Sequence, residues 1–558
     1  MSTRPYGWQR VISIKGLIVN IKILACFALG AASTFAAPDP YDYKELTTTA
    51  SNPIEIREGL FDFGKDGVGW LEMHGAEHGE YVVMIGEMTN AQGHVANPYP
   101  GSTIRCQRVS GRVCGEVMRF RMPADPWNLI GYDMENAPAI QLPRWAQIVF
   151  PFRYAEVLRK PGRLSSANLV RKMVHYPIDM NQSSFECDNA VLTELYGFFK
   201  YSILATSFCG VYVDGDRERT PYEADAYINQ LCQYAIDSDY SLARKSHEWL
   251  MEHPTWPTEW KQHSIKMAWA DWMWTGDTRS LAKYYGKLQK KLLGNYSRRD
   301  IVDWPMAERD GFVMTNSNSV VDAFHCRNLV EMGDIAEAIG KTGDAERYRK
   351  EAAAAKARFV ADYFDADSGL FRDAVETRHS SLHANAIALA FGLVPDGRVD
   401  GIVAFLEQKG LSCSVYFAQY LLEAFFEADR ADIAIKLMAS EGERSWKAML
   451  DFGSTISMEA WNMKAKPNQD LNHAWGSVPL NMISRYVLGV TPLEPGFSRI
   501  SIRPQIGELR NVKGVVPTAK GPVEVMVRDG RLSVSVPAPA RVVWFGRIHD
   551  VHAGHHQF

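Results

Sequence analysis

Five carboxylates lie within twelve residues in one short segment of the chain. Arg217 and Arg219 stand among them, and the pairs Asp214-Gly215 and Thr220-Pro221 predict a loop that joins two regular elements. Closely spaced carboxylates can separate their pKa values, so that one group stays protonated while another is ionised at the same pH. Cleavage of a glycosidic bond requires that combination. The five acids are Asp214, Asp216, Glu218, Glu223 and Asp225.

A second acidic position lies far downstream, at Glu459. It occurs in the stretch from Asp451 to Trp461, where Ser, Thr and Gly surround a lone Glu beside a Trp. This composition suits the polar floor of a pocket with one reactive carboxylate, and a surface Glu at a helix start is the alternative. His473 follows in His473-Ala-Trp475, and it could be a site residue or an ordinary hydrogen-bonded core histidine.

Aromatic residues are abundant, with 15 Trp and 23 Tyr. Their flat faces suit the C–H faces of sugar rings, although most of them are expected to fill a large core. Trp256 and Trp260 flank a loop-like Pro-Thr-Glu, and they could line a sugar site or pack in the core. Trp269 and Trp272 lie three residues apart on a predicted helix and are expected in the core.

Several classes of chemistry are excluded by what the sequence lacks. It has no phosphate loop, no dinucleotide fingerprint and no Gly-x-Ser-x-Gly elbow. His247-Glu248 begins like a zinc-protease motif, but Met251 stands where the second histidine is needed. A formal net charge of -4 gives no basis for a nucleic acid or an anionic membrane as partner. The histidines near the end of the chain are expected in a frayed terminus rather than in a metal site.

The N-terminus is typical of an export signal. Basic residues precede the apolar run 23–32, and Ala36-Ala37 is a plausible cleavage point before Pro38. The run is too short to span a bilayer once Lys22 is excluded. Residues 1–36 are therefore predicted to be a signal peptide, and the mature protein to be soluble and periplasmic or secreted. Cys26 leaves a lipoprotein acceptor as the alternative.

Cysteine usage is compatible with an oxidising compartment. Of eight cysteines, signal removal takes Cys26 away, and the remaining seven cannot all pair internally. Cys106 and Cys114 flank a loop-like insert and could form one local disulfide. The others are expected to behave as small buried apolar residues.

At 558 residues the chain is long enough for several domains, and three regions are distinguished by pattern. Residues 38–182 are predicted to be a β-sandwich, because β-branched and aromatic runs such as Tyr81 to Ile85 alternate with Gly, Pro and Asn clusters. Residues 491–558 are predicted to be a smaller β domain. Its clearest element is a hairpin in which Val523 to Val527 and Leu532 to Val536 flank the turn Asp529-Gly530.

Residues 183–490 are predicted to be helical. Apolar residues follow helical spacing in Asn189 to Phe208, and Asp344 to Phe364 is a strong helix. In Thr275-Gly-Asp277 and Thr342-Gly-Asp344, a Gly suits the end of one helix and the Asp suits the N-cap of the next. Repeated helix, turn and helix predict stacked hairpins, which could close into a barrel or form an open array.

Taken together, these features resemble the bacterial α-L-rhamnosidases of glycoside hydrolase family 78. The clearest match is Arg217-Glu218-Arg219-Thr-Pro-Tyr-Glu-Ala-Asp225, which is similar to the family's acidic motif. Weaker matches extend in order along nearly the whole mature chain. They are Asp62 to Trp70, Phe152 to Glu156, Ser184 to Cys187, Ser454 to Trp461, His473 to Trp475, Ser484 to Val490 and Pro492 to Pro504.

The resemblance implies an (α/α)6 barrel of six inner and six outer helices, between an N-terminal and a small C-terminal β-sandwich. It also implies inverting hydrolysis of terminal α-L-rhamnosyl groups without a cofactor or metal. Glu218 falls on the general-acid position and Glu459 on the general-base position, and an inverting pair must stand about 6.5–9.5 Å apart to admit a water. The expected sugar-binding residues are Asp214, Asp216, Arg219, Asp225, Trp260, Trp304, Trp446, Trp461 and His473.

The sequence departs from the family pattern in two ways. The spacing from Asp214 to Glu218 is one residue shorter, so either Asp214 or Asp216 takes the place of a second sugar-binding acid. Many members carry extra sugar-binding modules, and this chain has room for one N-terminal β domain, so another deoxy sugar or an unusual polysaccharide remains an alternative substrate. The partner is expected to be a carbohydrate, with the protein a monomer or homodimer.

Two other functions remain as alternatives. A polysaccharide lyase on a similar helical toroid would use Tyr or His as base and would need cations to neutralise a uronate, whereas this loop is rich in acids. A sugar-binding protein that has lost catalysis would not need both Glu218 and Glu459.

Overall fold

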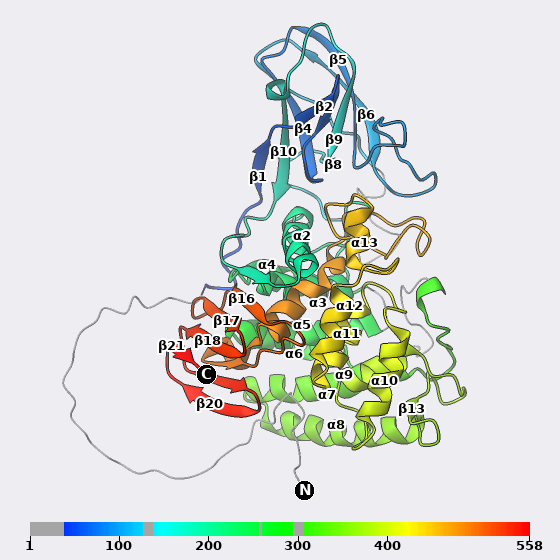
Figure 1. Cartoon of the computed structure of the whole chain (residues 1–558), viewed down its shortest axis with the longest axis vertical. Coiled ribbons are helices and arrows are strands. Elements are labelled where there is room, and N and C mark those ends of the chain that lie inside the picture. The colour runs from blue at the N-terminus through cyan, green and yellow to red at the C-terminus, as the bar shows by residue number, and fades with distance from the viewer. Residues whose placement is uncertain (1–37, 126–137, 256–258, 294–305) are drawn as a thin grey trace, which may run out of the picture.

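The computed structural model describes residues 38–125, 138–255, 259–293 and 306–558. Within this range the chain forms mainly strands, then helices, then strands again, in a mixed α+β architecture (Figure 1). The predicted signal peptide, Trp256 and Trp304 lie outside the described residues. None of the described helices is both long enough and apolar enough to cross a lipid bilayer.

The N-terminal β region consists of two antiparallel sheets. One has the order β1-β10-β4-β7 with β8 paired to β4, and the other has the order β2-β3-β9-β5-β6. Apolar side chains from both sheets form one shared core. The strands are β1 (Thr47–Ser51), β2 (Ile54–Arg57), β3 (Leu60–Asp62), β4 (Val68–His74), β5 (Gly79–Gly86), β6 (Cys106–Val113), β7 (Val117–Arg119), β8 (Phe150–Pro151), β9 (Tyr154–Arg159) and β10 (Leu169–His175).

The segment between Cys106 and Cys114 is a strand and not the loop that its composition indicated. It pairs along its whole length with β5, from Cys106 opposite Gly86 to Val113 opposite Gly79. An extended strand of this length holds its two ends roughly 26 Å apart. A disulfide needs Cα atoms within about 7 Å. Both cysteines are accordingly free, as are the other described cysteines.

The middle region is helical and begins where the sequence pattern predicted. Asn189 caps the first helix by accepting a hydrogen bond from the N–H of Leu192 at 3.0 Å. The helices are α2 (Ala190–Thr206), α3 (Glu223–Tyr234), α4 (Ser241–Glu252), α5 (Glu259–Thr275), α6 (Arg279–Gln289), α7 (Ser319–Ala338), α8 (Thr342–Tyr363), α9 (Leu382–Ala390), α10 (Val399–Lys409), α11 (Ala418–Glu427), α12 (Ala431–Met438), α13 (Trp446–Asp451) and α14 (Val478–Met482). A short hairpin of β12 (Phe364–Asp365) and β13 (Leu370–Phe371) follows α8.

Six helices form a closed series of contacts. Contacts join α3 to α5, α5 to α7, α7 to α9, α9 to α11 and α11 to α14, and α14 contacts α3 again. Every residue of α3 and of α9 is buried, which is expected of helices covered on all sides. The intervening helices α4, α8, α10 and α12 each pack against a member of this set, and α8 and α10 expose one polar face.

The helix junctions follow the predicted turn chemistry only in part. Gly276, with φ of 73°, ends α5 as expected, and Asp277 accepts a hydrogen bond from the N–H of Arg279 in the next helix. The second junction is displaced from Thr342-Gly-Asp344. Gly340, with φ of 75°, supplies the left-handed turn, so α8 already begins at Thr342.

The C-terminal β region consists of the sheets β11-β16-β17-β18-β21 and β14-β15-β19-β20. The predicted hairpin is present, with positive φ angles at Asp529 and Gly530. The final histidines are not frayed, because their strand β21 pairs with β18. The strands are β11 (Ser184–Cys187), β14 (Val490–Glu494), β15 (Arg499–Ile502), β16 (Asn511–Val516), β17 (Val523–Arg528), β18 (Arg531–Val536), β19 (Ala540–Trp544), β20 (Arg547–Val551) and β21 (Gly554–Gln557).

The C-terminal sheet also takes in a strand from before the helices. β11 pairs antiparallel with β16, and its Phe185 lies in the same core as the helices. The start of the helical region is thereby attached to the end of the chain.

Candidate active site

The acidic loop lies between α2 and α3 and folds back on itself. The N–H of Asp214 donates to the carbonyl of Thr220, and the Asp214 carboxylate accepts from the N–H of Thr220, both at 3.1 Å. At Gly215 a Cβ would stand 2.7 Å from the carbonyl oxygen of Asn472 and 2.8 Å from Oδ2 of Asp470. Only glycine allows this approach, and it brings the loop against residues 468–473.

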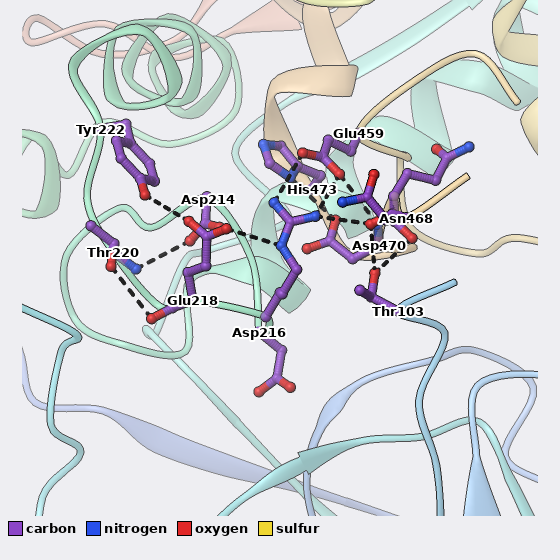
Figure 2. Close-up of polar contacts among 12 residues, drawn as sticks. Thr103, Asp214, Asp216, Glu218, Thr220, Tyr222, Glu459, Asn468, Asp470 and His473 are labelled. Carbon is purple, nitrogen blue, oxygen red and sulfur yellow. Dashed lines mark hydrogen bonds and ion pairs between the residues drawn. The ribbon is translucent and has the colours of Figure 1, made fainter. Parts of the chain in front are cut away.

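Arg217 connects the two glutamates that the sequence singled out. Its two terminal nitrogens donate to the Glu459 carboxylate at 2.9 and 3.1 Å, and its Nε donates to Oε1 of Glu218 at 3.1 Å. Figure 2 shows Glu218 and Glu459, the two residues that this guanidinium joins. Glu218 and Glu459 therefore lie at one site, although they come from opposite ends of the helical region.

Glu459 lies in a strongly cationic environment. Its side chain is 1% exposed and forms a second ion pair with Lys466 at 2.5 Å. Burial alone would raise the pKa of Glu459, but Arg217 and Lys466 outweigh it and hold the pKa well below the usual range. This carboxylate is therefore ionised across the physiological pH range.

Glu218 is more accessible, with a side chain 13% exposed. The hydroxyl of Tyr222 donates to its Oε2 at 2.6 Å. Burial and the nearby Glu218 carboxylate raise the pKa of Asp214 well above its usual value. Asp214 and Glu218 thus place two carboxyl groups close together on one side of Arg217, with Glu459 on the other.

A buried chain of charges runs behind Glu459. His473 Nε2 bonds to Asp225 at 2.8 Å, and Nδ1 bonds to Asp470 at 3.2 Å. Burial would lower the pKa of His473, but the hydrogen bonds to Asp225 and Asp470 raise it well above its usual value. His473 is therefore hydrogen-bonded between two carboxyl groups, which favour the protonated form of its ring.

Among the described residues, one group has the spacing of a metal site: Glu459, Asp470 and His473. Both ring nitrogens of His473 already bond to carboxylates, and Glu459 already has Arg217 and Lys466. A metal ion would have to compete with Arg217, Lys466 and His473 for these carboxylates, so the donor set does not fit a metal ion.

The other two charged residues predicted to bind sugar are engaged with each other. Arg219 donates to Oδ1 of Asp216 through Nε at 3.1 Å and through Nη2 at 2.6 Å. Arg105 of the N-terminal β region donates to Oδ2 of Asp216 at 3.2 Å, and Arg219 also donates to the carbonyl of Val149. Figure 2 shows Asp216 directed away from Glu218 and Glu459. The pair attaches the loop to the N-terminal β region.

The described tryptophans predicted to line the sugar site are all buried, with Trp446, Trp461 and Trp260 exposed by 0%, 1% and 2%. Trp446 and Trp461 are fully buried, contact each other edge to face, and donate to the carbonyls of Gly476 and Cys413. They form core beneath the site and present no surface to a ligand. Trp260 at the start of α5 packs on Tyr222, and its indole N–H has no hydrogen-bond partner in the described structure.

Several residues at this site were not selected from the sequence. The sequence placed Arg217 in the acidic loop without indicating its function. It gave no indication that Lys466, Asp470 and Tyr222 contribute to the site. Thr103 donates to the carbonyls of Asn468 and Gln469, so the N-terminal β region also reaches this loop. The one available signal was the polar run from Lys466 to Asp470 just before His473.

Comparison with known proteins gives two family matches. A family model described as the bacterial alpha-L-rhamnosidase 6 hairpin glycosidase domain matches residues 180–487. A model described as the bacterial alpha-L-rhamnosidase C-terminal domain matches residues 489–543.

Two curated relatives are named alpha-L-rhamnosidase. One from Alteromonas sp. (strain LOR) is 29% identical over 318 residues, which cover 50% of this chain and 33% of that protein. One from Formosa agariphila is 20% identical over 551 residues, which cover 86% of this chain and 54% of that protein. The chain thus spans between a third and about half of the length of these relatives.

Solved structures share the fold at low sequence identity. An alpha-L-rhamnosidase from Dictyoglumus thermophilum has a TM-score of 0.76 at 18% identity, covering 92% of this chain and 64% of the other. One from Streptomyces avermitilis, complexed with L-rhamnose, has a TM-score of 0.75 at 18% identity, covering 94% of this chain and 54% of the other.

Proposed function

Because the chain belongs to the bacterial alpha-L-rhamnosidases with a six-hairpin glycosidase domain, we propose that it is an inverting glycoside hydrolase. Its substrates are terminal α-L-rhamnosyl residues of glycosides or of oligosaccharides derived from polysaccharides. The observation that carries this proposal is the convergence of Glu218 and Glu459 on the single guanidinium of Arg217.

In this mechanism Glu459 is the general base and Glu218 the general acid. A base must be ionised before it can activate water, and the two cations on Glu459 favour that form. An acid must deliver a proton to the departing oxygen, and Glu218 lies in the more accessible position, beside the carboxyl group of Asp214. Hydrolysis then transfers one proton from Glu218 to the leaving group and one from water to Glu459.

The spacing of the two carboxylates supports inversion. They are separated by no more than two hydrogen bonds, of 3.1 and 2.9 Å, plus the width of a guanidinium group. That arrangement is compatible with the separation of about 6.5–9.5 Å that leaves room for a water. When the sugar binds, Arg217 gives up part of its contact with the glutamates and donates to the ligand instead.

Further residues would hold the sugar. Asp225 and His473 lie next to Glu459 and offer charged hydrogen-bonding groups, while Asp214 lies next to Glu218. Trp260 packs on Tyr222, and its unpartnered indole N–H would meet a sugar hydroxyl once neighbouring side chains move, because the residue is 2% exposed. Asp216 and Arg219 act by fixing the loop.

We also propose that the helices close into an (α/α)6 barrel, with α3, α5, α7, α9, α11 and α14 as inner helices. The return of the contact series from α14 to α3 supports closure. The shared core of the two N-terminal sheets supports a β-sandwich there, and the two C-terminal sheets support a second. The basic and apolar N-terminal segment supports export to the periplasm or the medium.

A screen of nitrophenyl glycosides against the purified mature protein tests the proposal. We expect hydrolysis of the α-L-rhamnoside above all other sugars, with proton NMR showing the inverted anomer as the first product. Preference for a different sugar would overturn the substrate, and a retained anomer would overturn the mechanism.

A further inference from the structure

Two buried carboxyl groups meet where the N-terminal β region contacts the helices. Asp66 precedes β4 and Glu87 follows β5, and their residues are 5% and 4% exposed. Burial raises the pKa of both carboxyl groups, and the nearby Asp66 raises that of Glu87 further. Burial and a like charge both favour the protonated form of Glu87.

Each member of the pair has a fixed set of partners. Oδ1 of Asp66 accepts from the N–H of Gly67 at 2.7 Å, and Oε2 of Glu87 accepts from the N–H of Arg105 at 2.6 Å. Negative charge on the pair is balanced by two arginines. The charged and titratable groups that face the pair are Arg105, Arg171, Tyr201 and Asp216.

Glu87 is linked to the acidic loop through one buried amide. Nδ2 of Asn472 donates to Oε1 of Glu87 at 2.9 Å, and Oδ1 of Asn472 accepts from the N–H of Asp216 at 2.7 Å. Asn472 also provides the carbonyl that leaves no space for a Cβ at Gly215. Arg105 forms a second link, since its N–H donates to Glu87 and its Nε donates to Asp216.

We propose that Glu87 is a positioning residue of the active site, orienting Asn472 and Arg105 against the loop that carries Arg217 and Glu218. The inference rests on the proposed role of Glu218. Ionisation of Glu87 adds a negative charge close to Asp66 and is expected to weaken this support of the loop.

Two substitutions of Glu87 separate positioning from stability. Glu87→Ala removes the acceptor of the Asn472 amide, and we expect kcat to fall about 10–100-fold with KM changed much less, because small displacements of catalytic groups are costly. Glu87→Gln keeps one acceptor oxygen for the Asn472 amide but places an NH2 group where Oε2 accepts from the N–H of Arg105, so it should restore part of the lost kcat. Asn472→Ala combined with Glu87→Ala should cost no more than the larger single loss.

Glu156→Ala is the matched control. Glu156 is equally buried in the same β region, but it bonds to Arg57, His94 and the N–H of Val95, within that region. This variant should lower Tm and leave kcat unchanged. Equal losses of kcat in Glu156→Ala and Glu87→Ala would overturn the proposal.

The pH dependence provides an independent measurement. Burial and Asp66 raise the pKa of Glu87 well above its usual value, so the stability that protonated Glu87 contributes is complete below its unfolded-state pKa and is lost as pH rises through the folded-state pKa. The ratio of kcat in Glu87→Gln to kcat in the wild type should therefore rise with pH. The other groups of the site are common to the two proteins, so their effects cancel in this ratio. A ratio independent of pH would contradict the proposal.

Hydrogen exchange tests the positioning role of Glu87 without relying on the proposed catalytic activity. In Glu87→Ala the backbone amides of residues 214–220 should exchange at least about tenfold faster than in the wild type, and in Glu156→Ala they should not. If the wild-type protein hydrolyses no glycoside, the proposed function fails while the exchange still tests positioning. Unchanged exchange in Glu87→Ala would overturn the positioning role alone.

Discussion

Arg217 donates both terminal nitrogens to Glu459, at 2.9 and 3.1 Å, and keeps Nε for Glu218. A bidentate guanidinium fixes the orientation of a carboxylate as well as its charge. One side chain therefore sets the geometry of both glutamates.

Glu218→Gln should remove the proton donor while keeping the shape of the side chain. We expect the rate on rhamnosides with poor leaving groups to fall about 10²–10⁴-fold, because such leaving groups need protonation. Substrates with a good leaving group should lose much less. Steady-state kinetics on two aryl rhamnosides, one with a poor and one with a good leaving group, measures the two rates. The Glu441→Gln variant, at an exposed position, is the control. Full activity on both substrates would refute the acid role.

Glu459→Ala should remove the base and open space on the water side of the sugar. The rate should fall at least about 10²-fold. Azide, which attacks without a base, should restore turnover and give a glycosyl azide of inverted configuration, identified by NMR. An azide product of retained configuration would mean that a covalent intermediate forms on another residue, and it would overturn the inverting mechanism.

Lys466→Met should reveal how much Glu459 depends on its second cation. The lowered pKa of Glu459 contributes stability that is present above its unfolded-state value of 4.5 and is lost as pH falls through the folded-state pKa. The Tm difference between wild type and Lys466→Met should therefore be constant from neutral pH to about pH 5 and shrink below. Thermal unfolding between pH 3 and pH 7 provides the comparison. A difference that grows on acidification would contradict it.

Gly215→Ala should disturb the loop through steric contact alone. Its Cβ would meet two oxygens at 2.7 and 2.8 Å, so the loop must move away from residues 470–472. We expect a lower Tm and a loss of kcat of at least about tenfold. Gly197→Ala on α2 is the matched control, since nothing lies within 4 Å of its Cβ and alanine favours a helix. Similar behaviour of the two variants would disprove the close approach.

Thiol chemistry should show no disulfide between Cys106 and Cys114. Mild reductant should leave Tm unchanged, and exposed Cys114 should react quickly with a thiol reagent. The buried Cys209, Cys232, Cys326 and Cys413 should react only after unfolding. Peptide mapping without reduction would expose a crosslink if one forms.

Local signals in the sequence were read correctly where a few neighbouring residues decide the conformation. The Asp529-Gly530 turn forms because both residues adopt positive φ, and Asn189 begins α2 because its side chain satisfies a free N–H. The family resemblance is confirmed by the family matches. Local signals failed where distant partners decide. The segment from Cys106 to Val113 looked like a loop because its pattern is irregular, yet pairing with β5 makes it a strand.

The same distinction between local signals and distant partners applies to the site. The types of residue were present in the sequence: clustered acids, a distant Glu459 and a histidine near its end. The sequence could not show that Lys466 neutralises Glu459, that Trp446 and Trp461 point into the core, or that Glu87 reaches the acidic loop through Asn472. The chain by itself determined which chemistry was available and which helices and turns would form, because both depend on residues close in sequence. Only the tertiary structure decided which charges meet and which are buried, because ionisation and orientation depend on neighbours that folding brings from far along the chain.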